Sequence, residues 1–129
     1  ETFTVEERKY TDWIRVTFKA GMGIKVRGIC RFYAMEMSPG FKCYMTPVHI
    51  DPDHPALPIS HPFTYATYLS KRFGPYATLG LAEDTWALNE RVIDEKAFLE
   101  QTYLIHEERE KMFFDALKKT KKGVAAVVF

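Results

Sequence analysis

The most regular pattern of hydrophobic and polar positions lies in the last third of the chain, between Asp94 and Phe129. Mostly apolar residues recur there every three or four positions, which is the spacing of one face of a helix. They are Phe98, Leu99, Thr102, Ile105, Arg109, Met112, Phe113, Ala116 and Leu117. Charged residues, Glu107 and Glu108 among them, fall mostly on the opposite face. The pattern predicts one helix of about 27 residues, with Asp94 as its N-terminal cap and Gly123 just past its end.

The final run, residues 124–129, contains no polar side chain. Such a run is typical of a strand buried on both faces, as in a parallel sheet covered by helices. One strand does not make a sheet, so we expect this segment to join the edge of another sheet in the chain, to pair with a second copy, or to fray. The chain also starts at Glu1 without a methionine and ends on Phe129. We therefore expect an excised segment of a longer protein.

The first fifty residues alternate between apolar and polar side chains, as strands do. The alternation predicts an antiparallel β-meander with strands over 13–20, 24–37 and 41–50, and residues 2–6 are a candidate edge strand. In the first strand, Ile14, Val16, Phe18 and Ala20 share one face. Gly28, in the middle of the second strand, indicates a bulge or a close approach of another backbone.

The middle of the chain is divided by proline and glycine. Four prolines in 51–62 exclude a regular helix or a central strand there. A helix is predicted from Pro62 to about Arg72, and a short helix or turn over 82–89. The fold class is therefore α+β: an antiparallel β-meander packed against two or three helices, one of them long, with a C-terminal apolar strand. We expect one domain, 1–129, made of the meander (1–50), the proline-rich loop with short helices (51–93), and the long helix with its terminal strand (94–129).

Composition and charge narrow the classes of partner. The net charge is +1, which gives no general electrostatic reason to expect a nucleic acid duplex or an anionic membrane as partner. No apolar run approaches the length of about 18 residues that a membrane span needs. If residues 38–40 form a hairpin turn, Cys43 faces about Met35 rather than Cys30, so both thiols should be free. Free thiols favour a reducing compartment such as the cytoplasm.

The richest group of metal-ligand types lies in the proline-rich loop and just before it. His49, Asp51, Asp53 and His54 are side chains that bind zinc or manganese. No wider ligand pattern accompanies them, and a polar loop with surface histidines explains the same residues. We assign no metal ligand and no catalytic residue in this chain, and these four remain the only metal candidates.

Three further groups have a functional and a structural interpretation. The cations Lys19, Lys25, Arg27, Arg31 and Lys42 could gather on one sheet face to bind an anion, or simply solvate that face. The carboxylates Glu83, Asp84 and Glu90 could serve acid–base chemistry or cap a helix, with Trp86 and Asn89 beside them as candidate ligand contacts. His106 precedes two glutamates but lacks the second histidine, four residues on, of a metalloprotease helix.

Several stretches resemble the bacterial type I phosphodiesterase/nucleotide pyrophosphatase family of the alkaline phosphatase superfamily. The resemblance lies in 79–90 (LGLAEDTWALNE), 105–117 (IHEEREKMFFDAL) and 123–129 (GVAAVVF). Residues 13–20 and 50–62 are similar to the middle region of the same family. Together these stretches cover most of the chain, but none of them is the family's catalytic signature.

The resemblance implies a definite chemistry for the parent protein. Members hydrolyse phosphate esters or diesters with two divalent metals, commonly zinc, and a threonine or serine nucleophile. The nucleophile is expected upstream of this chain, and a metal-binding Asp-to-His motif directly after 124–129. The chain is thus expected to be a non-catalytic insertion or cap region, inactive alone, whose partners are the rest of the parent chain and, in the parent, the phosphate-ester substrate. The alternative is a stand-alone module that binds an anion or a protein through the basic sheet face.

Overall fold

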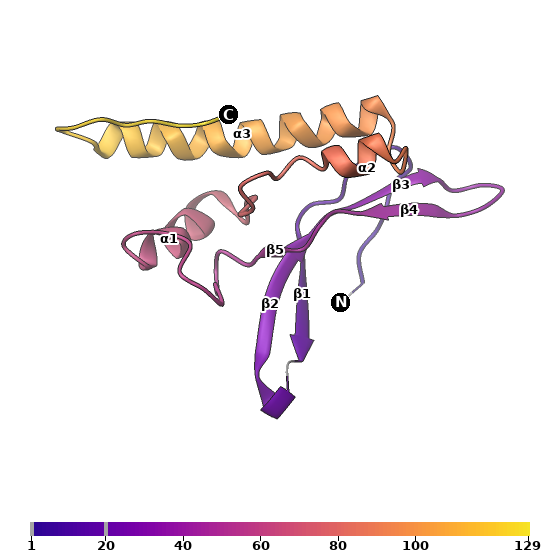
Figure 1. The fold of residues 1–129 in the computed structure, drawn as a ribbon, viewed down its shortest axis with the longest axis horizontal. Helices are drawn as coiled ribbons and strands as arrows, with labels where there is room; N and C mark the ends of the chain where they lie inside the picture. Colours follow the sequence, from indigo (N-terminus) through magenta and orange to yellow (C-terminus); the bar gives the residue numbers. More distant parts are fainter. Residues whose placement is uncertain (1, 20) are drawn as a thin grey trace.

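The computed structural model describes residues 2–19 and 21–129 and is α+β. Its spine is α3, Glu95–Lys119, a helix of 25 residues. Asp94 caps it, because its carboxylate accepts a hydrogen bond of 2.9 Å from the backbone N–H of Ala97. The long helix and its Asp94 cap are thus confirmed, but the helix ends at Lys119 with Thr120 as its C-terminal cap, so the predicted position of Gly123 just past the end is wrong. In Figure 1 the two shorter helices and both β-hairpins lie on the same side of α3.

The strands form two sheets rather than one meander. In the first, β1 (Ile14–Lys19) pairs antiparallel with β2 (Lys25–Cys30), which pairs with the short β5 (His49–Ile50). In the second, β3 (Phe32–Glu36) pairs antiparallel with β4 (Lys42–Met45). The 3-10 turn η1 (Gly21–Gly23) connects β1 to β2. Ala20, expected in the first strand, lies outside the described residues.

The predicted second strand, 24–37, is therefore wrong as a single strand, because it breaks at Arg31. The predicted third strand, 41–50, breaks between β4 and β5 in the same way. Arg31 and Thr46 pair across the two breaks: the N–H of Arg31 donates to Thr46 Oγ1 and the N–H of Thr46 donates to the Arg31 carbonyl, both at 3.0 Å. These bonds keep the backbone satisfied while each strand turns from one sheet into the other.

The predicted C-terminal strand is also corrected. Residues 124–129 are extended, but within the described part of the chain they pair with no strand. Figure 1 shows this tail doubling back along α3. The ring of Phe129 lies 4.6 Å from that of His106, centroid to centroid. The candidate edge strand over 2–6 does not form either; the nearby contacts with β3 are isolated bridges at Glu7 and Tyr10.

The core is built around three tyrosines. Tyr10, Tyr33 and Tyr44 pack with buried residues of the α2 region and the start of α3, which are Ala87, Ile93 and Ala97. The Tyr44 hydroxyl donates 2.7 Å to Asp84, the residue that caps α2 (Thr85–Asn89). A buried tyrosine hydroxyl usually finds such a partner, whereas the buried hydroxyls of Tyr10 and Tyr33 have none among the described residues. The core therefore joins the second sheet to α2 and the N-terminal half of α3.

The buried face of α3 contains most of the predicted positions, which are buried or partly buried, but it also includes polar residues that were not predicted. Its buried residues are Ala97, Gln101, Ile105 and Asp115, whereas Leu99 is 51% exposed. The polar members are buried because they have partners: Gln101 Oε1 accepts 2.7 Å from the N–H of Asp84. Asp115 accepts from Tyr68 and pairs with Arg72 at 2.9 Å, which fastens α1 (Thr64–Phe73) to α3. No helix in the described residues is long and apolar enough to cross a membrane.

Gly28 is a point where packing forbids a side chain, as the sequence indicated. A Cβ atom there would lie 2.4 Å from Val48 Cγ1 and 3.0 Å from the His49 carbonyl oxygen. Replacing Gly28 by alanine should lower the free energy of unfolding by about 1–3 kcal/mol, because β2 and β5 would be forced apart. Urea denaturation measures the change. Gly40→Ala, where a Cβ meets nothing within 4 Å, is the control and should be within about 0.5 kcal/mol of the parent chain. Equal midpoints for both variants would contradict the assigned pairing of β2 with β5.

Candidate functional site

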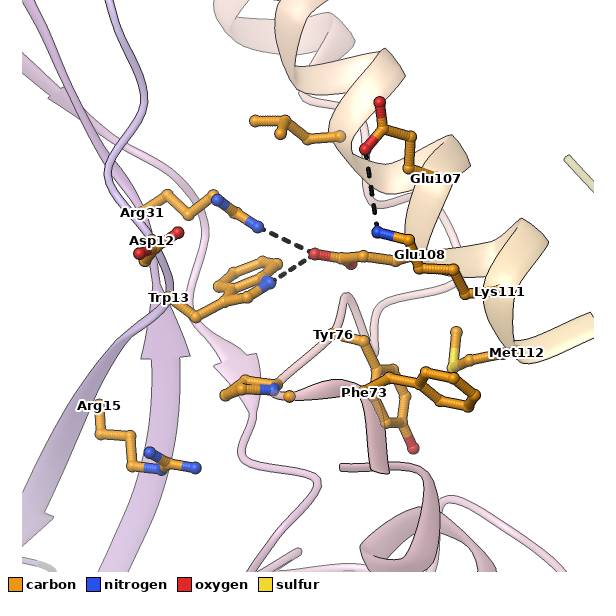
Figure 2. Close-up of a pocket in the computed structure, with 13 residues that line it drawn as sticks. Asp12, Trp13, Arg15, Arg31, Phe73, Tyr76, Glu107, Glu108, Lys111 and Met112 are labelled. Carbon is orange, nitrogen blue, oxygen red and sulfur yellow. Dashed lines mark hydrogen bonds and ion pairs between the residues drawn. The ribbon is translucent and has the colours of Figure 1, made fainter. Parts of the chain in front are cut away.

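The cavity chosen as candidate site has a volume of about 430 Å³ and lies where the start of β1, the end of α1 and the middle of α3 meet. Figure 2 shows its lining side chains. The size falls within the usual range for small-molecule sites. Its wall carries three cations and three carboxylates, which are Arg15, Arg31, Lys111, Asp12, Glu107 and Glu108. Because these formal charges cancel, the cavity has no net preference for an anion or a cation.

Glu108 lies at the centre of the wall and is fully engaged by the protein. One carboxylate oxygen accepts from the Trp13 indole at 2.7 Å and from Arg31 at 2.9 Å. The other accepts 2.8 Å from the backbone N–H of Ala77. The side chains of Arg31 and Glu108 are only 12% and 15% exposed, respectively. With three donors on two oxygens, Glu108 serves as a structural acceptor and has little capacity left for acid–base chemistry.

Arg31 lies at the bend between β2 and β3 and contacts both Glu108 and Trp13; we call these three residues the node. Its guanidinium also donates 2.8 Å to the Thr11 carbonyl and lies 4.6 Å from the centre of the Trp13 ring. A guanidinium over an aromatic face is favourable, and more so where water is excluded. One arginine thereby fixes the segment before β1, the bend between the sheets and α3. What remains accessible for a ligand is the rim, where Arg15, Asp12 and the Glu107–Lys111 pair lie.

The lining residues could hold a ligand by hydrogen bonds, charge and apolar contact. The lining residues include no serine, threonine, cysteine or histidine that could act as a nucleophile or general base. The aromatic and apolar residues of the wall lie apart: Trp13 is beside Arg31 at the strands, and Phe73 lies beside Met112 near α3 (Figure 2). The rim would contact the polar groups of a ligand.

His49 is buried and acts as an acceptor. Its Nδ1 accepts from the backbone N–H groups of Thr78 at 3.0 Å and Leu79 at 3.4 Å. Burial, with a smaller effect from the charge of Arg31, lowers the pKa of His49 to about 4. The imidazole is therefore neutral at pH 7, and the nitrogen that these amides contact cannot also serve as a metal ligand.

The other three metal candidates converge on one another but also on cations. His54 Nδ1 lies 3.9 Å from Oδ2 of both Asp51 and Asp53. Arg15 lies 3.6 Å from Asp51 Oδ2, and Lys71 pairs with Asp53 at 2.9 Å, which lowers the pKa of Asp53. Over residues 2–19 and 21–129, no three or more His, Cys, Asp or Glu side chains are placed to hold a metal ion. The two cations already neutralise the carboxylates that a metal would need.

The carboxylates Glu83, Asp84 and Glu90, at and before the short helix, do not form one site. Asp84 caps α2 by accepting 2.9 Å from the N–H of Ala87, as the structural interpretation predicted. Glu83 pairs with Arg109 at 2.9 Å, and Glu90 is exposed. Trp86 is 72% exposed and lies beside exposed Asn89 on α2. Trp86 therefore remains a candidate contact surface.

The five cations do not gather on one face. Lys19, Lys25 and Arg27 share one face of the β1–β2 hairpin, because Lys19 is directly opposite Lys25 and Arg27 is directly opposite Thr17. Arg31 belongs to the node with Glu108 instead. Lys42 lies in the second sheet and pairs with Glu36 at 2.9 Å. Part of the expected basic face therefore exists, on a smaller set of residues.

The sequence reasoning missed the structural role of Glu108 by placing it on the solvent face. One signal was available: Glu108 continues the spacing of four and three residues that runs through Gln101, Ile105, Met112 and Asp115. That row is the packed side of α3, and three of its five members, Gln101, Glu108 and Asp115, are polar. A search for apolar periodicity alone does not find it.

Comparison of the chain with protein-family models, curated proteins and solved structures finds no significant match. The resemblance to the phosphodiesterase family therefore rests on the stretches of sequence alone.

Glu108→Ala should lower the free energy of unfolding by about 2–4 kcal/mol, because Arg31, the Trp13 indole and an amide all lose their acceptor. The matched control is the adjacent Glu107→Ala, which removes only an exposed pair with Lys111 at 4.0 Å and should change stability by less than about 0.5 kcal/mol. Denaturant titration of both variants makes the comparison. Similar losses for the two glutamates would rule out the node.

His49 should make the chain sensitive to mild acid. Its folded-state pKa of about 4 lies below the ordinary 6.5, so between these values the unfolded chain binds a proton that the folded chain does not. Stability from this group is complete above pH 6.5 and falls by about 3 kcal/mol as the pH approaches 4. His49→Asn keeps an acceptor for Thr78 and should flatten the pH profile of unfolding, whereas the exposed His61→Asn should leave it unchanged. An unchanged profile in His49→Asn would refute the assignment.

Proposed function

We propose that this chain is a non-catalytic region of a larger metal-dependent phosphodiesterase or nucleotide pyrophosphatase, where it shapes access to the active site. The observation that carries the proposal is the state of residues 124–129. They form an apolar, extended segment whose Val124 and Val128 are 92% and 87% exposed. Their backbone groups make no hydrogen bond to other backbone in the described part of the chain.

The tail has the properties of a strand without a sheet. Ala125 and Val127 are half-buried, while their neighbours point to solvent, so the residues alternate as in a strand. Unpaired backbone and exposed β-branched side chains are unfavourable together, and both problems are solved when the segment enters a sheet. A sheet of the parent protein would supply the missing neighbours. Pairing with a second copy of the chain is the alternative, and the concentration dependence of sedimentation distinguishes the two.

The total surface supports the same proposal. The chain exposes 9029 Å² at a mass of 15.0 kDa. A folded monomer of this mass typically exposes about 7,000 Å². The excess of about 2,000 Å² is comparable to the area of a permanent interface. Large apolar residues of the α2 region, such as Leu81 and Trp86, are exposed and would contact the parent protein.

The family resemblance gives the proposed chemistry of the parent. The two divalent metals and the Thr or Ser nucleophile of the parent protein would lie outside this chain. The nucleophile would attack the phosphorus centre, and the metals would stabilise the charge on the attacking and leaving oxygens. This region would contribute the wall beside that site through α2 and the adjoining loop. Its partners would be the rest of the parent chain and the phosphate-ester substrate of the parent.

The gene provides the first test. If the proposal is correct, the codon after that of Phe129 encodes Asp, and a His codon follows a few residues later, as the family's metal motif requires. Any other coding sequence there removes the main support for the family.

The isolated chain should be inactive. With zinc or manganese it should not hydrolyse bis-p-nitrophenyl phosphate above the buffer rate, and calorimetric titration should show no stoichiometric metal binding. His49→Ala is the control and should behave like the unsubstituted chain in both assays. Stoichiometric metal binding with hydrolysis abolished by His49→Ala would overturn the proposal, because it would make the chain a metalloenzyme in its own right.

A further inference from the structure

We propose that the β1–β2 hairpin carries a binding surface for phosphate groups, formed by Lys19, Lys25 and Arg27 with the Thr17 hydroxyl. We name these four residues the cationic strip. The inference does not depend on the proposed function, because it concerns binding by the chain itself.

The register of β1 and β2 places the strip on one face. Lys19 is directly opposite Lys25, and Thr17 is directly opposite Arg27. In antiparallel pairs the Cβ atoms of opposite residues lie about 5 Å apart. Successive rows on one face are separated by about 7 Å, the rise of two residues. All four side chains are exposed, and Figure 1 shows the hairpin extending away from the helices.

The positive charges of the strip have no ion-pair partner among the residues that the structure describes. The described residues form no ion pair with Lys19, Lys25 or Arg27, whereas Arg15, Arg31 and Lys42 are all paired. Residues 13–35 contain no Asp or Glu. Like charges directly opposite each other on a hairpin are unfavourable, so an anion bound between Lys19 and Lys25 would relieve a repulsion that the folded chain contains.

The nearest carboxylates are already neutralised. The backbone N–H of Asp51 lies 3.4 Å from the Arg27 carbonyl, so the loop after β5 borders the base of the strip. Asp51 is fully buried beside Arg15, and Asp53 is paired with Lys71. Two cations thus balance two carboxylates at the base, and the excess charge lies farther along the hairpin.

The chemistry of the face favours phosphate over an acidic protein segment. Its remaining apolar residue, Ile29, is fully buried, so an occupant would be held by charge and hydrogen bonds rather than by apolar contact. The guanidinium fork of Arg27 fits two phosphate oxygens, lysine acts as a point charge, and Thr17 can donate from its hydroxyl. Val16, Phe18 and Val26 lie on the opposite face. A protein could therefore cover that apolar face and leave the strip open.

The test is a titration of the chain with inorganic tripolyphosphate at low ionic strength, followed by backbone amide signals. Changes should be concentrated in residues 15–27, and affinity should fall when salt is raised from about 50 to 200 mM. The double variant Lys19→Gln, Lys25→Gln should bind at least tenfold more weakly. It should remain folded, because it removes a repulsion, and its amide spectrum checks this. The matched control, Lys118→Gln with Lys121→Gln near the end of α3, should bind like the unsubstituted chain.

A short single-stranded oligonucleotide as a second probe distinguishes a phosphodiester from an oligophosphate as the preferred source of the same phosphate chemistry. Equal losses in the two double variants would overturn the proposal, as would changes centred on 118–122 or no change at millimolar tripolyphosphate. Binding to anionic lipid vesicles without binding to either soluble probe would also overturn it. Failure of these experiments leaves the hydrolase proposal intact, since that rests on the gene and the terminal segment.

Discussion

The contact on which this fold depends is the ion pair between Arg31 and Glu108. The two long predicted strands would extend in one plane if nothing stopped them, but Arg31 lies where the first of them bends. Its guanidinium is held between the Trp13 ring and the Glu108 carboxylate, and the same carboxylate accepts from the loop at Ala77. A buried pair of this kind adds little net stability by itself, but losing one partner is costly. It therefore acts chiefly to fix how the two sheets, the loop and α3 are placed relative to one another.

The molecule buries several polar side chains and exposes many large apolar ones. Inside, Tyr44, Gln101 and Asp115 are buried with hydrogen-bond partners, and outside, leucines, valines and Trp86 are exposed. A chain that functions alone would gain by exchanging them. Exposed apolar residues of this kind are typical of a surface that contacts more protein, which agrees with the proposed role in a larger hydrolase.

The β1–β2 hairpin illustrates how one element can serve two purposes. Alternation gives it an apolar face and a cationic face, and a two-stranded hairpin is only marginally stable in water without cover. Contact with a larger protein would stabilise the apolar face, and phosphate groups would relieve the repulsion on the other. The two kinds of contact do not depend on each other, because the cationic and the apolar side chains lie on opposite faces of the hairpin.

The sequence alone determined the elements whose cause is local. The long helix and its Asp94 cap follow from spacing and capping, the close approach at Gly28 follows from a glycine in a strand, and the α+β class follows from alternation before a helical period. Tertiary structure decided the rest. The bend at Arg31, the burial of Glu108 and the dispersal of the five cations depend on partners distant in sequence, which periodicity does not encode. The apolar run at 124–129 was identified as a strand by composition, but a strand needs a neighbour to supply hydrogen bonds, and within the described chain it has none.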